Sequence, residues 1–284
     1  MRVIAHGGAG SVPDDPDARR SVLESAVENG VVASTPLDAV VATIEDLEAD
    51  DRFNAGLGSW PQSDGIARTD AGLMTADREV GAACSMPGVE HASSVARVVM
   101  EETPHVLVSG VHAVDLAADF GIETGVDLWS DRTRGRWDDL EETPTGGPSD
   151  HLDWLQDRFG GHDTVGAVAV DGDRVAAGTS TGGRWLALAG RVGDVPQVGS
   201  GFYAAPAGGA SATGSGEDIA RVTLTRRAVD HLESGYDAQS AADLAIEEFE
   251  DVTGSDAGVI VADVEGTVGS AFNTAAMQTA TARR

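Results

Sequence analysis

The chain has 284 residues and a formal net charge of −28, from 47 acidic and 19 basic residues, and every basic residue is arginine. A chain this acidic repels phosphate backbones, which excludes a nucleic-acid partner. No apolar run approaches the roughly 20 residues of a membrane span, which argues against a membrane protein. The first residues lack the apolar core of a signal peptide, so we expect a cytoplasmic location.

The single cysteine, Cys84, excludes an internal disulfide, and no cluster of zinc-type ligands is present. Cys84 lies among small apolar residues and is expected to be buried. A charge of −28 is typical of disorder, but 41% hydrophobic residues in periodic segments favour a folded domain. A hypothesis that fits both is a salt-rich cytoplasm, since about 1 M salt screens charges beyond about 3 Å. Full folding and activity without salt would contradict it.

The first half alternates strands and helices. Apolar spacing predicts a helix over 17–32, and Thr35-Pro36 is typical of a helix start for a second one that carries Ile44 and Leu47 on its inner face. Another helix is expected from Ser93 or Ser94 to a stop at Pro104, followed by a short strand and a helix over 111–120. The expected strands of this half are 2–5, 66–74, 80–85 and 105–109.

The segment 125–161 is charged, lacks a sustained apolar period, and is expected to be a linker. Its three tryptophans, Trp129, Trp137 and Trp154, are expected to attach it to the rest of the protein. Strands over 164–170 and 174–179 follow, joined by an Asp171-Gly172 turn. After a glycine-rich stretch at 181–216, the sequence predicts helices at 217–232 and 238–249 and strands at 258–264 and 267–272.

Each half therefore contributes strands and a pair of helices. Because both faces of two packed sheets need helical cover, this pattern predicts an α+β fold, a four-layer αββα sandwich in one domain.

One motif suggests a serine esterase. Residues 178–182 match the G-x-S-x-G pattern around Ser180, and 6–10 resemble an oxyanion loop. The two motifs are about 170 residues apart, however, and His231, the only later histidine, lies in a predicted helix. Phosphate-binding loops are excluded because the chain lacks lysine and the third glycine at the required spacing.

Thr164 is the stronger candidate because it begins a strand directly after the expected linker. If the chain were cut before it, one residue would carry both a hydroxyl nucleophile and an α-amino general base, whose ordinary pKa is about 7.7–8.0. A threonine here also suits a strand start, so the residue alone leaves both interpretations open.

Seven segments, in order and at similar spacings, decide between them: HGGAG (6–10), FNAGLG (53–58), TPHVLVSG (103–110), HDTVGAVAVD (162–171), AAGTSTGG (176–183), GRVGD (190–194) and TGSGE (213–217). As a set they resemble the plant-type asparaginases, isoaspartyl peptidases and glycosylasparaginases of the N-terminal-nucleophile hydrolases. The resemblance spans nearly the whole chain.

The resemblance implies that the bond between Asp163 and Thr164 is cut by the protein itself, giving subunits 1–163 and 164–284. It makes Thr164 the nucleophile and Thr181 its hydrogen-bond partner. Thr213 and Gly214 then form the oxyanion hole, and Asn54 approaches the nucleophile from the first subunit.

The resemblance also assigns Arg191 to the substrate α-carboxylate, Asp194 to its α-amino group and Gly216 to a backbone contact at the same end. A planar guanidinium suits a carboxylate, which makes chemical sense of Arg191. From the residues alone, Arg191 and Asp194 could equally pair with each other. The resemblance further suggests a sodium-binding loop at Leu47, Glu48, Phe53, Ala55 and Leu57, and no organic cofactor.

The implied activity is hydrolysis of L-asparagine and β-aspartyl dipeptides by a homodimer of αβ heterodimers. The Asp-Thr bond is typical of glycosylasparaginases, which remain an alternative, whereas the NAGLG segment favours the asparaginase branch. Val195 stands where relatives often have serine, with little expected effect. A serine esterase and a non-catalytic amino-acid-binding protein are alternatives of other classes.

Overall fold

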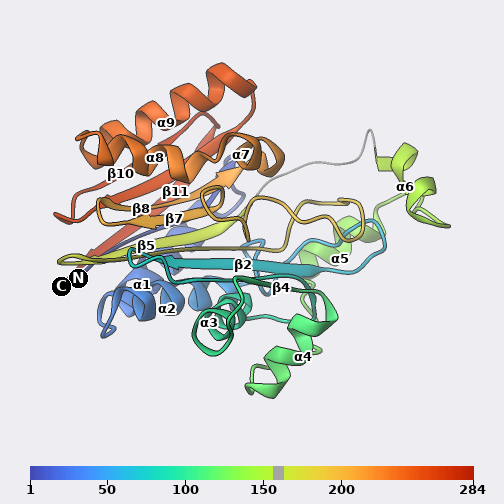
Figure 1. The fold of residues 1–284 in the computed structure, drawn as a ribbon. Coiled ribbons are helices and arrows are strands. Elements are labelled where there is room, and N and C mark those ends of the chain that lie inside the picture. The colour runs from blue at the N-terminus through green and yellow to red at the C-terminus, as the bar shows by residue number, and fades with distance from the viewer. Residues whose placement is uncertain (156–162) are drawn as a thin grey trace.

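The structure, a computed structural model, describes residues 1–155 and 163–284. His162 and the end of the predicted 125–161 linker lie outside the described residues. Eleven strands of the described chain form two sheets, and helices lie against the outer face of each (Figure 1).

The larger sheet has seven strands and interleaves the two halves of the sequence. Its order is β11 (Ala276–Arg283), β1 (Arg2–Gly10), β5 (Val165–Asp171), β6 (Arg174–Thr181), β2 (Arg68–Thr75), β3 (Val80–Pro87) and β4 (Leu107–Ser109). All neighbours are antiparallel except β3 and β4. The predicted hairpin β5–β6 is confirmed and lies at the centre. Strand β5 begins directly after Thr164, so the sheet fixes the position of that residue.

The smaller sheet consists of β10 (Val268–Phe272), β9 (Ala257–Asp263), β8 (Gly208–Gly214) and β7 (Phe202–Ala205). It packs on the larger sheet through β5 and β8, where glycines allow a close approach. A Cβ on Gly166 would collide with the hydroxyl of Ser211, and a Cβ on Gly209 would lie 3.0 Å from Val168 Cγ1. Gly166 faces Ser211, and Val168 faces Gly209. The two strands β5 and β8 therefore run in opposite directions where they face each other.

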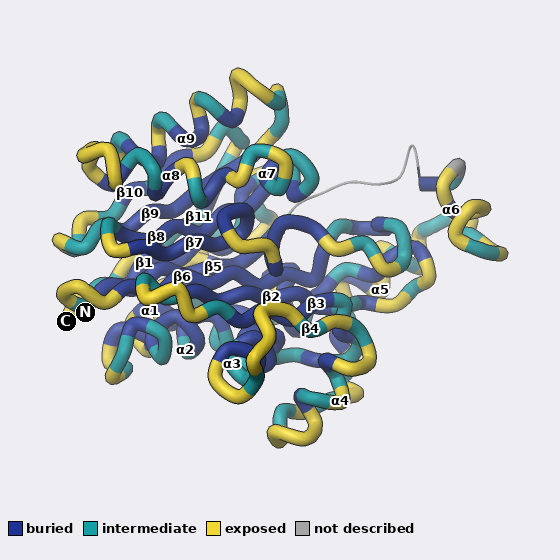
Figure 2. The backbone as a smooth tube through the Cα atoms, in the orientation of Figure 1, coloured by how far each residue is buried: buried dark blue, intermediate teal, exposed yellow. Residues whose placement is uncertain are grey.

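The helices cover the outer faces. Helices α1 (Pro16–Val31), α2 (Pro36–Glu48) and α3 (Ala92–Glu102) lie on the larger sheet, and α8 (Leu224–Glu233) and α9 (Ala238–Thr253) on the smaller one. Buried residues lie along the strands of both sheets and on the inner faces of the helices (Figure 2), and the apolar ones form two core clusters. The α+β class is confirmed. The start of α2 is also confirmed, because Thr35 Oγ1 accepts the Asp38 N–H at 3.1 Å. Cys84 is buried, as predicted.

Several predicted elements were wrong. The segment 125–161 contains α5 (Asp131–Asp138) and α6 (Pro148–Leu155), short charged helices whose apolar contacts are mainly tryptophans. The glycine-rich 181–216 contains β7 and β8, because the close sheet packing requires residues without bulky side chains. The predicted helix 217–232 is two helices, α7 (Gly216–Val222) and α8, separated at the left-handed Thr223 (φ 54°).

Two smaller errors concern helix starts and the C-terminus. Neither Ser93 nor Ser94 caps α3, because the helix begins at Ala92 and Ser93 bonds to Glu48 instead. Strand β11 was not predicted, because it is an edge strand that pairs only with β1 and its sequence contains several polar residues.

A further helix, α4 (Val111–Asp119), follows β4 as expected.

The tryptophans attach the 125–155 segment as predicted. Trp137 and Trp154 pack against buried Leu155, Trp185 and Leu186, and Trp129 contacts Trp137 edge-on. Within residues 1–155 and 163–284, no helix combines the length and hydrophobicity needed to cross a bilayer.

Candidate active site

Thr164 lies buried at the start of β5, with 7% of its surface exposed. Its Oγ1 lies 3.3 Å from Oγ1 of Thr181, at the end of the neighbouring strand β6. Thr213 ends β8 in the other sheet, two residues after Ser211, which faces Gly166. Extending this register by two residues in each strand predicts that Thr213 lies opposite Thr164, where the two sheets meet.

The peptide bond before Thr164 is held by hydrogen bonds to its carbonyl oxygen. The Asp163 carbonyl accepts Nδ2 of Asn54 at 2.9 Å and Oγ1 of Thr181 at 3.2 Å. The Asn54 amide is fixed because its Oδ1 accepts the Trp60 N–H at 2.9 Å. Two donors thus point at the oxygen on which charge would develop if the Asp163 carbonyl were attacked.

The side chain of Asp163 is bound to a buried arginine that sequence reasoning missed. The guanidinium of Arg19 lies 3.2 Å from Asp163 Oδ2 and over the ring of Phe53, at 4.5 Å from its centroid. Burial raises the pKa of Asp163, while Arg19 opposes the shift. Gly8 must be glycine here (φ 102°), because a Cβ would collide with the Asp163 carboxylate.

Arg191, Asp194 and Gly216 also come together. A Cβ on Gly216 would lie 2.8 Å from Arg191 Nη2 and would collide with Oδ1 of Asp194. Arg191 and Asp194 do not form an ion pair with each other, so the interpretation that they serve only as each other's partners is not supported. Its Nε instead donates to Glu217 at 2.9 Å. Glu217 was not predicted, although it ends the TGSGE segment.

Asp194 is a buried carboxylate with unused bonding capacity. Its Oδ2 has no hydrogen-bond partner among the described residues, and burial raises the pKa of Asp194 to about 6, against the opposing effect of Arg191. Another buried carboxylate near Arg191, Asp70, has its pKa raised by burial to about 7. Glu217 has its pKa lowered to about 2 by Arg191 and Arg184, despite partial burial. The guanidinium group of Arg191 therefore lies near the carboxylate of Asp194, whose Oδ2 has no hydrogen-bond partner among the described residues.

Thr213 and Gly214 are the two residues of the predicted oxyanion hole. Thr213 Oγ1 accepts the Ala9 N–H at 3.3 Å, which ties β8 to the HGGAG segment. Gly214 has φ 137°, and a Cβ there would press against the backbone of Asp256 and Ala257. Its backbone conformation and surroundings therefore require glycine.

The surroundings of Ser180 do not support the serine-esterase alternative. Ser180 is fully buried, and its Oγ donates to Glu48 Oε1 at 2.6 Å. Glu48 also accepts the N–H and hydroxyl of Ser93. His6 of the proposed oxyanion loop bonds Ser211 at 2.9 Å, and burial lowers its pKa to about 3. The Ser180 hydroxyl therefore faces a carboxylate in the interior, without a histidine base among its bonded partners.

The predicted sodium loop lies at the end of α2 and in the turn that follows. The Glu48 carbonyl accepts the Leu57 N–H at 2.8 Å. Gly58 faces the carbonyls of Asp51 and Phe53, so backbone oxygens turn inward here. Leu47, Phe53 and Ala55 are fully buried. Over the described part of the chain, no group of three or more His, Cys, Asp or Glu side chains could hold a metal.

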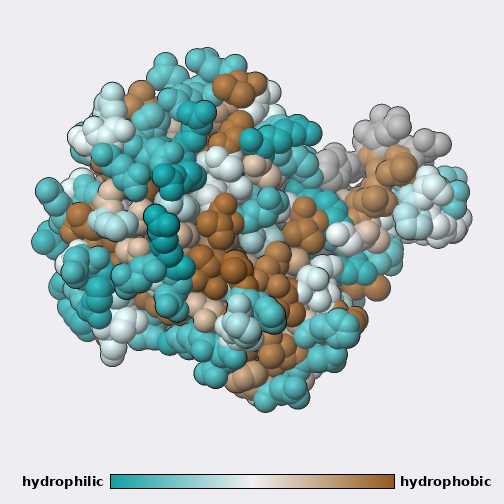
Figure 3. Space-filling view, viewed as in Figure 1, coloured by the Kyte–Doolittle hydropathy of each residue, from teal (hydrophilic) through white to brown (hydrophobic). Residues whose placement is uncertain are grey.

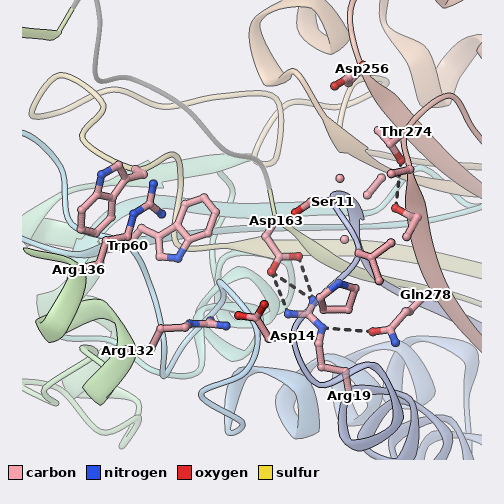
Figure 4. A pocket seen from close by; sticks show the side chains of 18 of the residues that line it. Ser11, Asp14, Arg19, Trp60, Arg132, Arg136, Asp163, Asp256, Thr274 and Gln278 are labelled. Carbon is pink, nitrogen blue, oxygen red and sulfur yellow. Dashed lines mark hydrogen bonds and ion pairs between the residues drawn. The ribbon is translucent and has the colours of Figure 1, made fainter.

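A cavity of about 590 Å³ opens beside the Asp163–Thr164 bond (Figure 4). Residues 8–10 of the HGGAG segment and Asp163 line it, and α5 contributes Arg132 and Arg136. Trp60 and Trp185 line the same wall. The cavity thus adjoins Asp163, the residue before Thr164, and has a cationic, aromatic side, while Asp14 and Asp256 also line it.

Comparison with known proteins gives one consistent result. The asparaginase family profile matches residues 1–284. A plant-type L-asparaginase of Pyrococcus abyssi is 40% identical over 96% of this chain and 93% of its own length. One of Pyrobaculum calidifontis is 41% identical, over 97% and 94%. An isoaspartyl peptidase/L-asparaginase of Danio rerio is 34% identical, over 99% and 92%.

Proposed function

The chain belongs to the asparaginase family, and on that premise we propose that it hydrolyses the side-chain amide of L-asparagine and β-aspartyl dipeptides through Thr164. It is a hydrolase, as its family and relatives indicate. The observation that supports Thr164 most directly is the pair of donors, from Asn54 and Thr181, on the carbonyl oxygen of the preceding peptide bond.

The first step in this proposal is cleavage of the chain by itself. Oγ1 of Thr164 adds to the Asp163 carbonyl carbon while Asn54 and Thr181 stabilise the oxyanion. The carbon–nitrogen bond then breaks, the Thr164 nitrogen takes up the hydroxyl proton, and an ester joins Asp163 to Thr164 Oγ1. Water hydrolyses that ester to give chains 1–163 and 164–284.

The freed Thr164 then acts on substrate. Its amine takes the hydroxyl proton, Oγ1 adds to the side-chain carbonyl of the substrate, and Thr213 and Gly214 hold the oxyanion. The carbon–nitrogen bond breaks, the amine returns the proton to the leaving nitrogen, and ammonia or an amino acid departs. Water, deprotonated by the same amine, releases aspartate and restores the threonine.

The aspartyl end of the substrate carries an α-carboxylate and an α-ammonium group. In the proposal, the terminal nitrogens of Arg191 bind the carboxylate, since Glu217 uses its Nε. The unpartnered Oδ2 of Asp194 binds the ammonium group, and Gly216 lies between them. Glycosylasparagine carries the same aspartyl end, so a glycosylasparaginase remains the second candidate, favoured only by the Asp-Thr bond.

The finer architecture belongs to the same proposal. Helices on the outer faces of both sheets support a four-layer αββα sandwich in a single domain. The apolar side chains of Val106, Leu107 and Val111 are 47–63% exposed beside the edge strand β4 (Figure 3), which supports pairing of two processed copies. The inward carbonyls near Gly58 suit sodium, and Leu47, Glu48, Phe53, Ala55 and Leu57 would hold it.

Mass spectrometry of incubated protein, with assays of ammonia and aspartate release, tests the proposal. Wild type should yield a chain that begins at Thr164 and release aspartate from both substrates. Thr164→Ala should remain a single chain near 29.1 kDa without activity, whereas Ser180→Ala should cleave and hydrolyse. An intact wild-type chain that still hydrolyses asparagine would refute the role of Thr164. An intact chain that binds asparagine without hydrolysis would favour the amino-acid-binding alternative.

A further inference from the structure

We infer that the cavity beside Asp163 is a carboxylate-recognition subsite that binds the free α-carboxylate of the leaving residue in β-aspartyl dipeptides, with Arg19 and Arg132 as its cationic groups. The inference rests on the proposed function and adds to it the part of the substrate beyond the scissile amide.

The structure already holds a carboxylate at this place. The Asp163 side chain lies 3.2–3.3 Å from the terminal nitrogens of Arg19, and Arg132 adds a second favourable charge that lowers the pKa of Asp163. Figure 4 shows Arg19 and Arg132 on different sides of Asp163. In the uncut chain, Asp163 therefore occupies the subsite itself.

Cleavage makes Asp163 the end of the first chain, with a new α-carboxylate, so that this end can move away from Arg19 and another carboxylate can take its place. Arg19 is itself fixed independently of Asp163, since it also bonds the carbonyl oxygens of Gly7 and Arg52 and Oε1 of Gln278 at 3.2 Å. A buried guanidinium held in this way is preorganised for a carboxylate. When Asp163 leaves, its unmet charge would favour a new anionic partner.

The covalent geometry of a β-aspartyl dipeptide matches the position of the Asp163 side chain. The Asp163 carboxyl carbon is four bonds from the Thr164 nitrogen. In the substrate complex, the leaving nitrogen lies within hydrogen-bond distance of that amine, about 3 Å, and the leaving carboxyl carbon is two bonds further. Both carboxylates can thus reach a similar distance from the same nitrogen.

Arg132 forms no ion pair with a carboxylate of the described residues, although the Asp14 carboxylate lies near it in the same cavity (Figure 4). Its only hydrogen bond to the described residues is a long one, 3.4 Å, to the Arg52 carbonyl. Arg136, one turn later, stacks on Trp185 at 4.1 Å from the ring centroid and forms the wall. Arg132 is therefore the cation of the cavity that is available for a substrate carboxylate. Asparagine releases ammonia and so has no leaving-group carboxylate that could bind Arg132.

The test compares kcat/KM for a β-aspartyl dipeptide with that for L-asparagine, on fully cleaved protein. In Arg132→Gln, the dipeptide-to-asparagine ratio should fall about tenfold, mainly through KM, as expected for one charged hydrogen bond. Arg134→Gln is the matched control on the same helix, because Arg134 pairs with Asp127 and does not line the cavity. It should keep the wild-type ratio.

A dipeptide whose C-terminal carboxylate is replaced by a carboxamide provides the second arm. Wild type should discriminate against it, and Arg132→Gln should lower its kcat/KM no further. An unchanged ratio in Arg132→Gln, or equal losses for the carboxylate and carboxamide dipeptides, would overturn the subsite while leaving the proposed function intact. Cleaved wild type that hydrolyses neither asparagine nor the dipeptide would instead overturn the proposed function, and the subsite with it.

Discussion

The side-chain nitrogen of Asn54 lies 2.9 Å from the carbonyl oxygen of Asp163, a residue 109 positions later in the chain. Asn54 Nδ2 also bonds the Gly183 carbonyl at 2.6 Å, so strands and loops from both halves orient the amide. One bond of this amide therefore joins the two predicted subunits, through Gly183, while the other addresses the bond whose cleavage would create them.

We expect Asn54→Ala to slow chain cleavage by about a hundred- to thousandfold, the usual loss for one oxyanion donor. The measurement is the fraction of cleaved chain over time, by denaturing gel or mass spectrometry. Asn29→Ala is a suitable control, because Asn29 is exposed and bonds only Asp46 among the described residues. Cleavage of Asn54→Ala at the wild-type rate would remove this donor from the processing step.

Glu217 positions Arg191, and its loss should weaken binding of the aspartyl end common to all the proposed substrates. Glu217→Gln removes the ionic contacts to Arg191 (2.9 Å) and Arg184 (3.0 Å). We expect KM to rise for asparagine and the dipeptide alike, by roughly three- to tenfold, because a half-exposed pair contributes about 1 kcal/mol. Steady-state kinetics check this, with Glu248→Gln, which removes a distant arginine pair, as control. An effect on the dipeptide alone would contradict the assignment.

Ser180 is expected to stabilise the fold without a part in catalysis. In Ser180→Ala, the fully buried Glu48 carboxylate loses a 2.6 Å donor, so the free energy of unfolding should fall by about 1–3 kcal/mol. Denaturant unfolding measures this loss, and Ser21→Ala, at an exposed helix position, is the control. Activity per cleaved molecule should match wild type, and its disappearance would revive the esterase interpretation.

Much of the site could be predicted because short motifs fix local geometry. Thr164 and Thr181 end up on adjacent strands, and their hairpin was readable from alternating residues around Asp171-Gly172. Gly216, Arg191 and Asp194 are close in the fold as well, and the resemblance named all three.

The rest depends on long-range contacts that leave no local pattern. Arg19 reads as one more surface arginine of α1, yet the fold buries it against Asp163, 144 positions away. Strand β11 alternates weakly because it forms an edge, and β7 and β8 are hidden by the glycines and alanines that close sheet packing demands. The G-x-S-x-G pattern at Ser180 kept an esterase alternative open for a similar reason, since burial, not sequence, decides whether a hydroxyl can reach a substrate.

Asp194 makes the proposed activity sensitive to acid. Its pKa is raised to about 6, so the carboxylate that would pair with the substrate ammonium group is lost as the pH falls through 6 and restored above it. The Thr164 amine must also be neutral to act as a base, and its ordinary pKa is about 7.7–8.0. Both ionisations change activity in the same direction, so log kcat/KM should fall with a slope near 2 per pH unit below pH 6.

In Asp194→Asn the slope should drop to about 1, with a lower plateau above pH 8 from the lost charge pair. A slope of 2 retained in Asp194→Asn would assign the acid limb to another carboxylate, of which the buried Asp70, with its pKa raised to about 7, is the first to examine by Asp70→Asn.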